Sequence, residues 1–136
     1  MESRTVTIET GHEFAHVDLT GHVEAFLADV GAGDGLVNVF LPHATAGVAI
    51  MELEPGTRAD TPRVLGDLLP RDGRWAHDHG SPGHGADHVL PLLVAPSVSI
   101  PVLGGRLQLG TWQSVVLVDP NVDNPTRTVR VSFLSG

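Results

Sequence analysis

The residues best suited to chemistry are histidines, half of which fall in one stretch rich in glycine and carboxylate. Three of these histidines could bind a divalent metal ion, zinc or magnesium, through the nitrogen of a neutral imidazole. They are His77, His84 and His88. A histidine pair spaced HxxxH, such as His84 and His88, is diagnostic of a metal site only on a continuous helix. Gly83 and Gly85 favour a loop instead. The alternative interpretation is therefore that these are solvated loop histidines.

Catalytic candidates lie on both sides of this stretch. Glu52 follows the apolar run 48–51, so we expect it to be partly buried and to need a metal, an arginine or a histidine as partner. A structural salt bridge would satisfy it equally well. His43 lies between two expected strands and could act as acid, base or ligand, or could be a surface histidine in a capped turn. The catalytic candidates are His43, Glu52, Asp60 and His88.

Residues that could bind a phosphorylated small molecule form a second group. The hydroxyl of Thr45 could hold a phosphate oxygen, and the guanidinium groups of Arg106 and Arg127 offer planar forks to an oxyanion. Gln113 could serve as a polar handle. Ordinary structural roles compete in each case, since surface ion pairs are the commoner fate of arginine in an acidic chain. Four further histidines are assigned to the surface: His12, His16, His22 and His79.

Composition narrows the classes of partner. The chain has 136 residues, a formal charge of -8, no lysine and no cysteine. Its field repels phosphate backbones and anionic lipid, so we expect no nucleic-acid partner and no membrane partner. The lack of cysteine excludes disulfides and thiolate metal sites.

No signal peptide is recognisable at the start, so a cytoplasmic location is expected. The length predicts one domain, residues 1–136.

The first half of the chain must position these groups with strands and one helix. Alternation over 4–9 predicts a half-buried strand. Apolar residues spaced i, i+3, i+4 and i+7 from Val23 predict a helix that ends at Gly31. Short buried strands are then expected over 36–41 and 45–51, on either side of His43.

Two more helices are expected in the middle of the chain. Thr61 is a good cap for a helix with Pro62 at its first position and an end near Pro70. A third helix capped by Asp87 would place Pro91 in its first turn, where proline is tolerated. His88 would then stand at a helix N-terminus, beside backbone N–H groups that favour an anion.

The last third of the chain is predicted to be mostly strand. Segments 97–103 and 106–109 are joined by Gly104-Gly105, a two-residue hairpin signal. A buried strand over 114–118 and a last strand that contains Arg127 follow a loop rich in proline and asparagine. The whole pattern predicts an α+β fold with a large mixed, mostly antiparallel sheet and about three helices.

Several motifs in order resemble one known family. These are His43-Ala44-Thr45, Glu52, Asp60, His77-Asp78, His88 and the segment Gly105 to Gln113. In that order and spacing they resemble the YjbQ family, often labelled secondary thiamine-phosphate synthase. The likeness covers nearly the whole chain. Three positions depart from it. Met51 stands where asparagine usually precedes the glutamate, and His84 falls near a position that often carries asparagine. Pro91 interrupts what is usually a smoother helix.

The resemblance implies an α+β homotrimer with a site built from recurrent histidines and acids. It also implies a weak transferase activity that joins a pyrimidine methyl diphosphate to a thiazole phosphate, which is thiamine-phosphate synthase chemistry. The first hypothesis is therefore an enzyme that acts on a phosphorylated small molecule at a His/carboxylate site, with a divalent metal. The alternatives are a non-catalytic trimer that binds a metal or small ligand, and a purely structural trimer.

Overall fold

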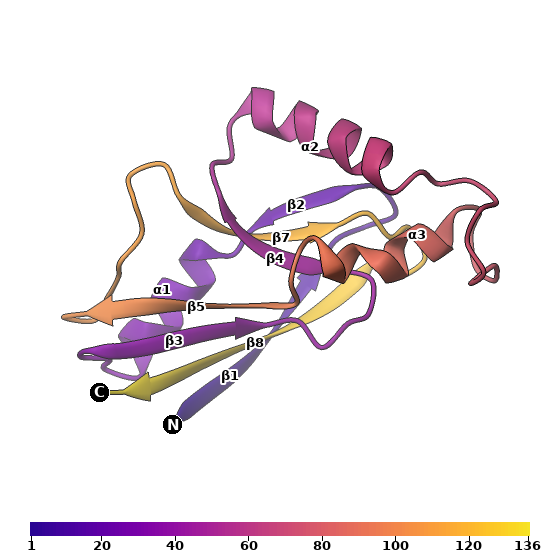
Figure 1. Cartoon of the computed structure of the whole chain (residues 1–136). Coiled ribbons are helices and arrows are strands. Elements are labelled where there is room, and N and C mark those ends of the chain that lie inside the picture. The colour runs from indigo at the N-terminus through magenta and orange to yellow at the C-terminus, as the bar shows by residue number, and fades with distance from the viewer.

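Eight β-strands and three α-helices make up the computed structural model, which describes all residues 1–136 (Figure 1). In chain order the elements are β1 (Glu2–Glu9), β2 (Ala15–Asp18), α1 (Thr20–Asp29), β3 (Gly35–Phe40), β4 (Gly47–Met51), α2 (Pro55–Leu68), α3 (His84–Val89), the 3₁₀ turn η1 (Leu90–Leu92), β5 (Ser97–Leu103), β6 (Arg106–Leu107), β7 (Ser114–Asp119) and β8 (Thr126–Ser135). The predicted α+β class with three helices is confirmed.

The strands form two sheets in which every pairing is antiparallel. One sheet has five strands in the order β1-β8-β3-β5-β6, and the other has three in the order β2-β7-β4. β8 alternates as the sequence predicts, with Val129, Val131 and Phe133 buried and Arg130 exposed. The Gly104-Gly105 hairpin is confirmed, since Leu103 pairs with Arg106 and both glycines have positive φ.

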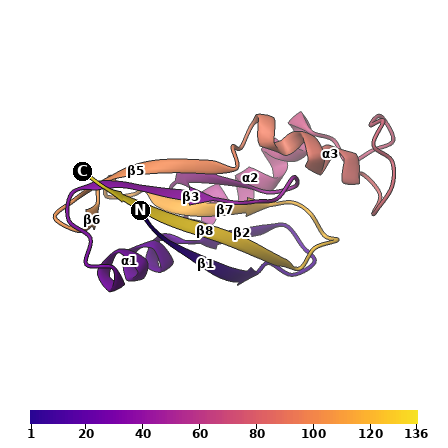
Figure 2. The ribbon, with the colours of Figure 1, turned by 90° about the horizontal axis from the view of Figure 1, so that it is seen from below.

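One apolar cluster joins the two sheets to α1. Helix α1 contributes Val23, Phe26 and Leu27, the stripe predicted from their spacing, and all three are buried. The interior residues of β3, β5, β7 and β8 complete the same cluster. Figure 2 shows α1 and α3 at opposite ends and on opposite sides of the molecule. The core therefore fixes the sheets and leaves α3 free to carry polar groups at the other end.

Helix α2 begins seven residues before the predicted start. Its cap is Glu54, whose carboxylate accepts the backbone N–H of Thr57, and Pro55 occupies the first turn. The same cap-and-proline signal occurs at Thr61-Pro62, which lies inside the helix, where the Thr61 hydroxyl donates to the carbonyl of Thr57 (2.7 Å). No residue of α2 is buried. With 14 residues it is the longest helix, and no helix combines the length and apolarity that a membrane crossing needs.

Helix α3 also differs from its prediction. Its N-cap is Gly83, so Asp87 lies inside the helix and is buried, and His88 lies in the last turn. The expected anion site at a helix N-terminus beside His88 is therefore wrong. Pro91 falls in the separate turn η1, where its missing N–H breaks no α-helical bond.

Two strands were mispredicted. The four-residue strand β2 was not predicted from its sequence, Ala-His-Val-Asp. It forms because β7 offers an unpaired edge, to which Ala15–Asp18 pairs from Asp119 back to Val116. The other error is the length of β6, which ends at Leu107 rather than at 109.

Candidate metal centre

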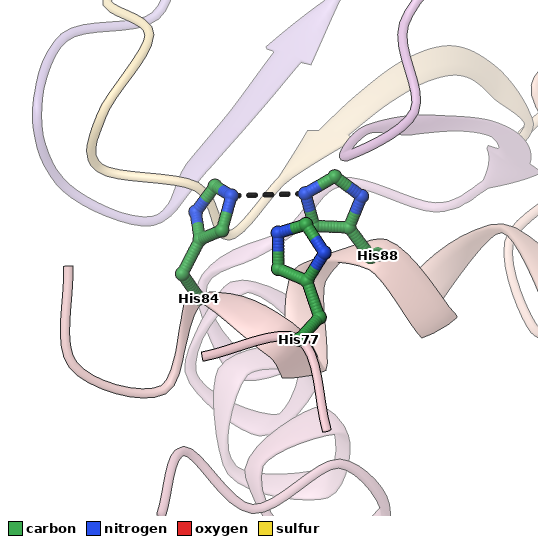
Figure 3. A group of neighbouring side chains, drawn as sticks. All are labelled: His77, His84 and His88. Atoms are coloured by element: carbon green, nitrogen blue, oxygen red, sulfur yellow. Dashed lines mark hydrogen bonds between the residues drawn. The ribbon is translucent and has the colours of Figure 1, made fainter. Parts of the chain in front are cut away.

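Three histidines converge at α3. His84 and His88 are four residues apart on one helix and so lie on the same face, and His77 approaches from the preceding loop (Figure 3). One ligand nitrogen from each of the three lies within 4.8 Å of the others. The Nε2 atoms of His84 and His88 are 2.9 Å apart. The expectation of a loop here was wrong, and the HxxxH pair does occupy a continuous helix.

Close backbone contacts at two glycines allow this convergence. Gly83 has φ 78°, and a Cβ there would lie 2.4 Å from Cβ of Arg71 and 2.6 Å from its Cα. A Cβ on Gly85 would lie 2.4 Å from Cβ of Trp75 and 2.5 Å from the carbonyl oxygen of His77. The indole of Trp75 donates to the carbonyl of Pro70 (2.7 Å), which fastens the same loop. The glycines that argued against a helix are thus what lets the loop carrying His77 rest on it.

Replacing Gly83 by alanine is expected to lower the free energy of unfolding by at least about 2 kcal/mol, because the left-handed backbone is costly and the new Cβ would meet Cβ and two backbone atoms of Arg71. Urea denaturation followed by circular dichroism measures it. The matched control is Gly66→Ala in exposed α2, where nothing lies within 4 Å of the new Cβ and a gain of about 0.5–1 kcal/mol is expected. Equal behaviour of the two variants would rule out the packing role of Gly83.

The three imidazoles differ in their surroundings. Nε2 of His77 is buried and has no hydrogen-bond partner. Nδ1 of His84 lies 2.7 Å from the carboxylate of Asp123, so we assign the Nδ1 proton to that contact, which leaves Nε2, 2.9 Å from Nε2 of His88, without a proton. Burial, followed by the nearby His77 and His84, lowers the pKa of His88. The lowered pKa of His88 favours its neutral imidazole, which is the form that binds metal.

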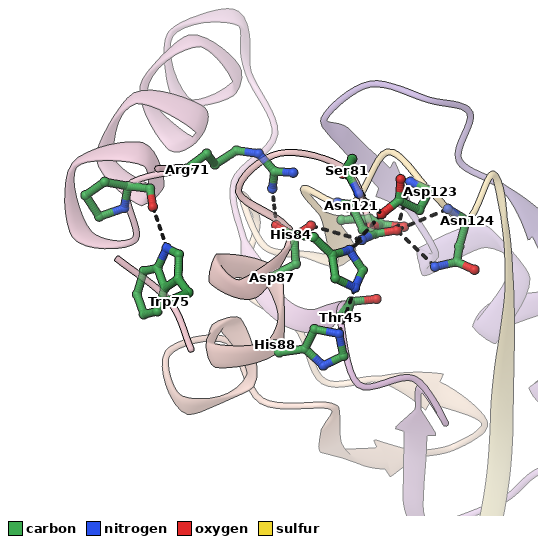
Figure 4. Close-up of polar contacts among 12 residues, drawn as sticks. Thr45, Arg71, Trp75, Ser81, His84, Asp87, His88, Asn121, Asp123 and Asn124 are labelled. Carbon is green, nitrogen blue, oxygen red and sulfur yellow. Dashed lines mark hydrogen bonds and ion pairs between the residues drawn. The ribbon is translucent and has the colours of Figure 1, made fainter. Parts of the chain in front are cut away.

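A network behind α3 fixes His84 (Figure 4). Asn121 is fully buried; its Nδ2 donates to Asp87 (2.9 Å) and lies 3.1 Å from Nδ1 of His84. Its Oδ1 accepts from the backbone N–H groups of Asp123 and Asn124 (both 3.1 Å), so the amide has one orientation. The N–H and hydroxyl of Ser81 donate to Asp123 and lower the pKa of that carboxyl. The carboxylate facing His84 therefore stays ionised.

A second polar group lies where β7, β8 and the strand junction at 43–45 meet. Nε and Nη2 of Arg127 donate to the two oxygens of Asp119 (2.6 and 3.0 Å), and Nη2 also donates to the hydroxyl of Thr45 (2.8 Å). All three residues are buried. The sequence suggested Thr45 and Arg127 as phosphate-binding groups, whereas in the structure Arg127 binds Asp119 and Thr45 binds Arg127.

His43 adjoins this buried group. Its Nε2 accepts the backbone N–H of Thr128 (2.8 Å), and this acceptor role requires a neutral ring. Burial and then the positive charge of Arg127 lower its pKa, in agreement with that state. Nδ1 of His43 therefore carries the ring proton and is the atom that could donate to a ligand.

Four other candidates lie away from the histidines. Glu52 is exposed, so its predicted burial is wrong. Figure 1 shows β4 beginning beside α3 and leading away from it, with Glu52 just after its far end. Asp60 is an exposed partner of Arg63 on α2 (3.1 Å). Arg106 and Gln113 are exposed near the hairpin end, where Gln113 accepts the N–H of Gly110. A single chain does not bring these four to His88.

Several residues of the site were missed. They are Arg71, Asp87 as a buried anion, Asn121 and Asp123. The asparagine and aspartate content of the loop 120–125 is a usable signal, since short polar side chains in a loop often bind backbone and neighbouring groups. Two of the supposed surface histidines also have specific surroundings: the ring of His79 lies 4.1 Å from that of His77, and Nε2 of His16 is buried.

A polar pocket of about 370 Å³ opens beside the histidine cluster. Arg71, Trp75 and Ser81 contribute to its wall, together with His77 and His84. A smaller, mostly apolar pocket lies between α2 and α3 and shares Arg71 with it. His77 and His84 therefore border a space that could admit a small molecule.

The fold and the site together define a class of small α+β proteins that carry a histidine cluster on a short helix beside antiparallel sheets. Comparison with known families identifies the class, since the model described as UPF0047 protein YjbQ-like matches residues 4–136. This chain belongs to the YjbQ family, as the resemblance of its motifs predicted.

Relatives extend across bacteria and archaea. A UPF0047 protein of Mycobacterium bovis is 61% identical over 120 residues, which cover 88% of this chain and 92% of that protein. The crystal structure of a hypothetical protein from Aeropyrum pernix K1 has a TM-score of 0.89 and 37% identity and covers 100% of both chains. A YbjQ-like protein of unknown function from Sulfolobus solfataricus shares the fold, with a TM-score of 0.92, 24% identity and coverage of 99% and 97%.

Proposed function

We propose that residues 1–136 form one YjbQ-like domain whose His77, His84 and His88 bind a divalent metal ion. The observation that carries the proposal is the convergence of three imidazole nitrogens within 4.8 Å, one of them buried without a partner. The carboxylate of Asp123 on His84 is the kind of contact that orients a metal-binding imidazole. Nitrogen donors favour zinc over magnesium, which prefers oxygen ligands.

We propose further that the centre is catalytic and acts on a phosphorylated small molecule, with thiamine-phosphate synthesis as the first reaction to test. A metal ion bound there would supply Lewis-acid stabilisation of charge on phosphate oxygens. His88 would hold it, and the adjoining pocket would exclude bulk water and orient the substrate. Nδ1–H of His43 would act as a hydrogen-bond or proton donor.

Participation of Glu52 and Asp60 requires a second subunit, and we propose a homotrimer for this reason. Large exposed apolar side chains occur in separate segments of the chain, among them Leu92 (84% exposed) in η1 and Trp112 (74% exposed) in the loop before β7. Two different patches that bind head to tail generate a closed ring when the rotation between neighbouring subunits closes. Such a ring would place the Glu52 end of one subunit beside α3 of the next.

The test combines metal content with turnover. Protein purified without a histidine tag is expected to hold about one zinc ion per chain by elemental analysis and to form thiamine phosphate from the two phosphorylated precursors. Light scattering in the same buffer measures the mass, for which the expected value is three chains. The metal proposal fails if zinc is absent and cannot be added stoichiometrically.

A second candidate is a non-catalytic protein that binds a metal or a small ligand. The observation that favours it is that neither Glu52 nor Asp60 reaches the histidines within one chain. Turnover separates the two candidates. Stoichiometric zinc with product formation no faster than in Glu52→Ala or His88→Ala would favour the binding protein.

A further inference from the structure

Arg71 is the one arginine in the wall of the polar pocket beside the histidines. Its Nη1 donates to Asp87, a carboxylate that is 1% exposed and also accepts from Asn121 (2.9 Å). The backbone of Arg71 rests directly against Gly83, as the short Cβ distances there show. One corner of the guanidinium is thus anchored to the same network that orients His84.

The rest of this guanidinium has no protein partner. A guanidinium carries five N–H donors, and the bond to Asp87 is the only one that Arg71 makes through its side chain. The side chain remains 32% exposed. An anchored fork with free donors at the wall of a pocket has the chemistry of an oxyanion-binding group.

The other charged groups around the pocket are mostly committed. Asp72 pairs with Arg74, whose Nε and Nη2 lie 2.8 Å from its oxygens. Asp123, behind His84, is occupied by Ser81 and by that histidine. Asp78 is exposed and makes no ion pair. Arg71 is therefore the cation of this pocket with donors to spare.

We propose that Arg71 recognises the oxyanion of the ligand, and that this ligand carries a phosphate-type dianion rather than a carboxylate. The proposal rests on the metal centre proposed above, because a divalent ion and Arg71 together supply the positive charge that a dianion matches. Arg71 thus takes the phosphate-binding role that the sequence suggested for Arg127 and Arg106. Arg127 is paired with Asp119, and Arg106 lies near the hairpin end.

Titration calorimetry of zinc-loaded protein with inorganic phosphate tests this role. Arg71→Met is expected to weaken phosphate binding by about 10- to 100-fold, the value of one or two hydrogen bonds between charged groups. Arg71→Lys, which keeps a charge beside Asp87 but loses the fork, is expected to fall between Arg71→Met and wild type. The matched control is Arg130→Gln on β8, an exposed arginine without an ion pair, which should bind as wild type does.

The outcomes separate this inference from the metal proposal. Zinc content is measured on every sample, so failure of wild type to hold zinc counts against the metal centre. Two results with zinc-loaded protein would show that Arg71 is not the recognition group. One is that phosphate does not bind the wild type, and the other is that phosphate binds Arg71→Met as tightly as it binds the wild type. Binding of acetate in preference to phosphate would overturn the ligand class. Should Arg71→Met fail to fold by circular dichroism, Arg71→Lys decides: unchanged affinity overturns the role, and weakened affinity supports it.

Discussion

Replacing His84 by alanine is expected to weaken zinc binding by at least about 100-fold, because changing a residue that only orients a metal ligand already costs 10- to 100-fold. His84 contributes a nitrogen to the cluster and is the histidine that Asp123 orients. Competition with a chromophoric zinc chelator at neutral pH measures the affinity. Asp123→Asn is expected to show a smaller loss, about 10-fold, because it changes the orientation of the ring and leaves the nitrogen in place.

The control for His84 is His22→Ala on α1, an exposed histidine outside the cluster. Its zinc affinity should equal that of wild type. Urea unfolding of each variant in the presence of chelator separates lost coordination from lost structure. Equal zinc affinity in His84→Ala and His22→Ala would remove His84 from the site and leave the HxxxH spacing without a role.

Replacing Asp119 by alanine is expected to lower the free energy of unfolding by about 3–5 kcal/mol, since it leaves the guanidinium of Arg127 buried without a counter-charge. Asp119 is 0% exposed and Arg127 2% exposed, and two hydrogen bonds join them. For a domain of this size the loss corresponds to a fall in Tm of roughly 10–20 °C. Calorimetry or a thermal melt followed by circular dichroism measures it.

Two comparisons sharpen this second prediction. Asp29→Ala breaks an exposed pair with Arg4 (2.7 Å) and is expected to cost less than about 1 kcal/mol. The double variant Asp119→Ala with Arg127→Met should be more stable than Asp119→Ala alone, because no buried charge remains. If Asp119→Ala lowers the free energy of unfolding no more than Asp29→Ala does, the buried pair contributes little to stability.

Period and spacing predicted the parts of the fold that local physics determines. The spacing of Val23, Phe26 and Leu27 fits a helix with one buried face, and the alternation in β8 fits a strand with one buried face. Helix starts were less certain because one signal can occur twice. Glu54-Pro55 and Thr61-Pro62 both combine a cap with a proline, and only the earlier pair begins α2.

The candidate site was predicted only in part, for a reason that lies in tertiary contacts. The histidine types and the i, i+4 spacing of His84 and His88 are visible in the sequence. Their helix was missed because Gly83 and Gly85 have low helix propensity, and the contacts with Arg71 and Trp75 that require them are invisible without the fold. The partners Asn121 and Asp123 lie more than thirty residues away in sequence.

Glu52 shows the opposite error. An apolar run before a carboxylate predicted burial, but β4 ends at Met51 and the chain turns outward toward α2. The position of a polar residue just beyond a strand depends on where the next element leads, and periodicity within the strand does not record that. The sequence indicated that the loop containing His77 carries groups able to do chemistry. It did not indicate that this loop and Arg71 together line the polar pocket.

The loop between β7 and β8 has a consequence for the order in which the protein is made. Asn121 receives its backbone anchor from Asp119 (2.9 Å), and Asp119 in turn holds Arg127 on β8. A nascent chain that has emerged only as far as α3 contains all three clustered histidines but neither Asn121 nor Asp123. Nearly the whole polypeptide must therefore leave the ribosome before Asn121 and Asp123 can orient His84.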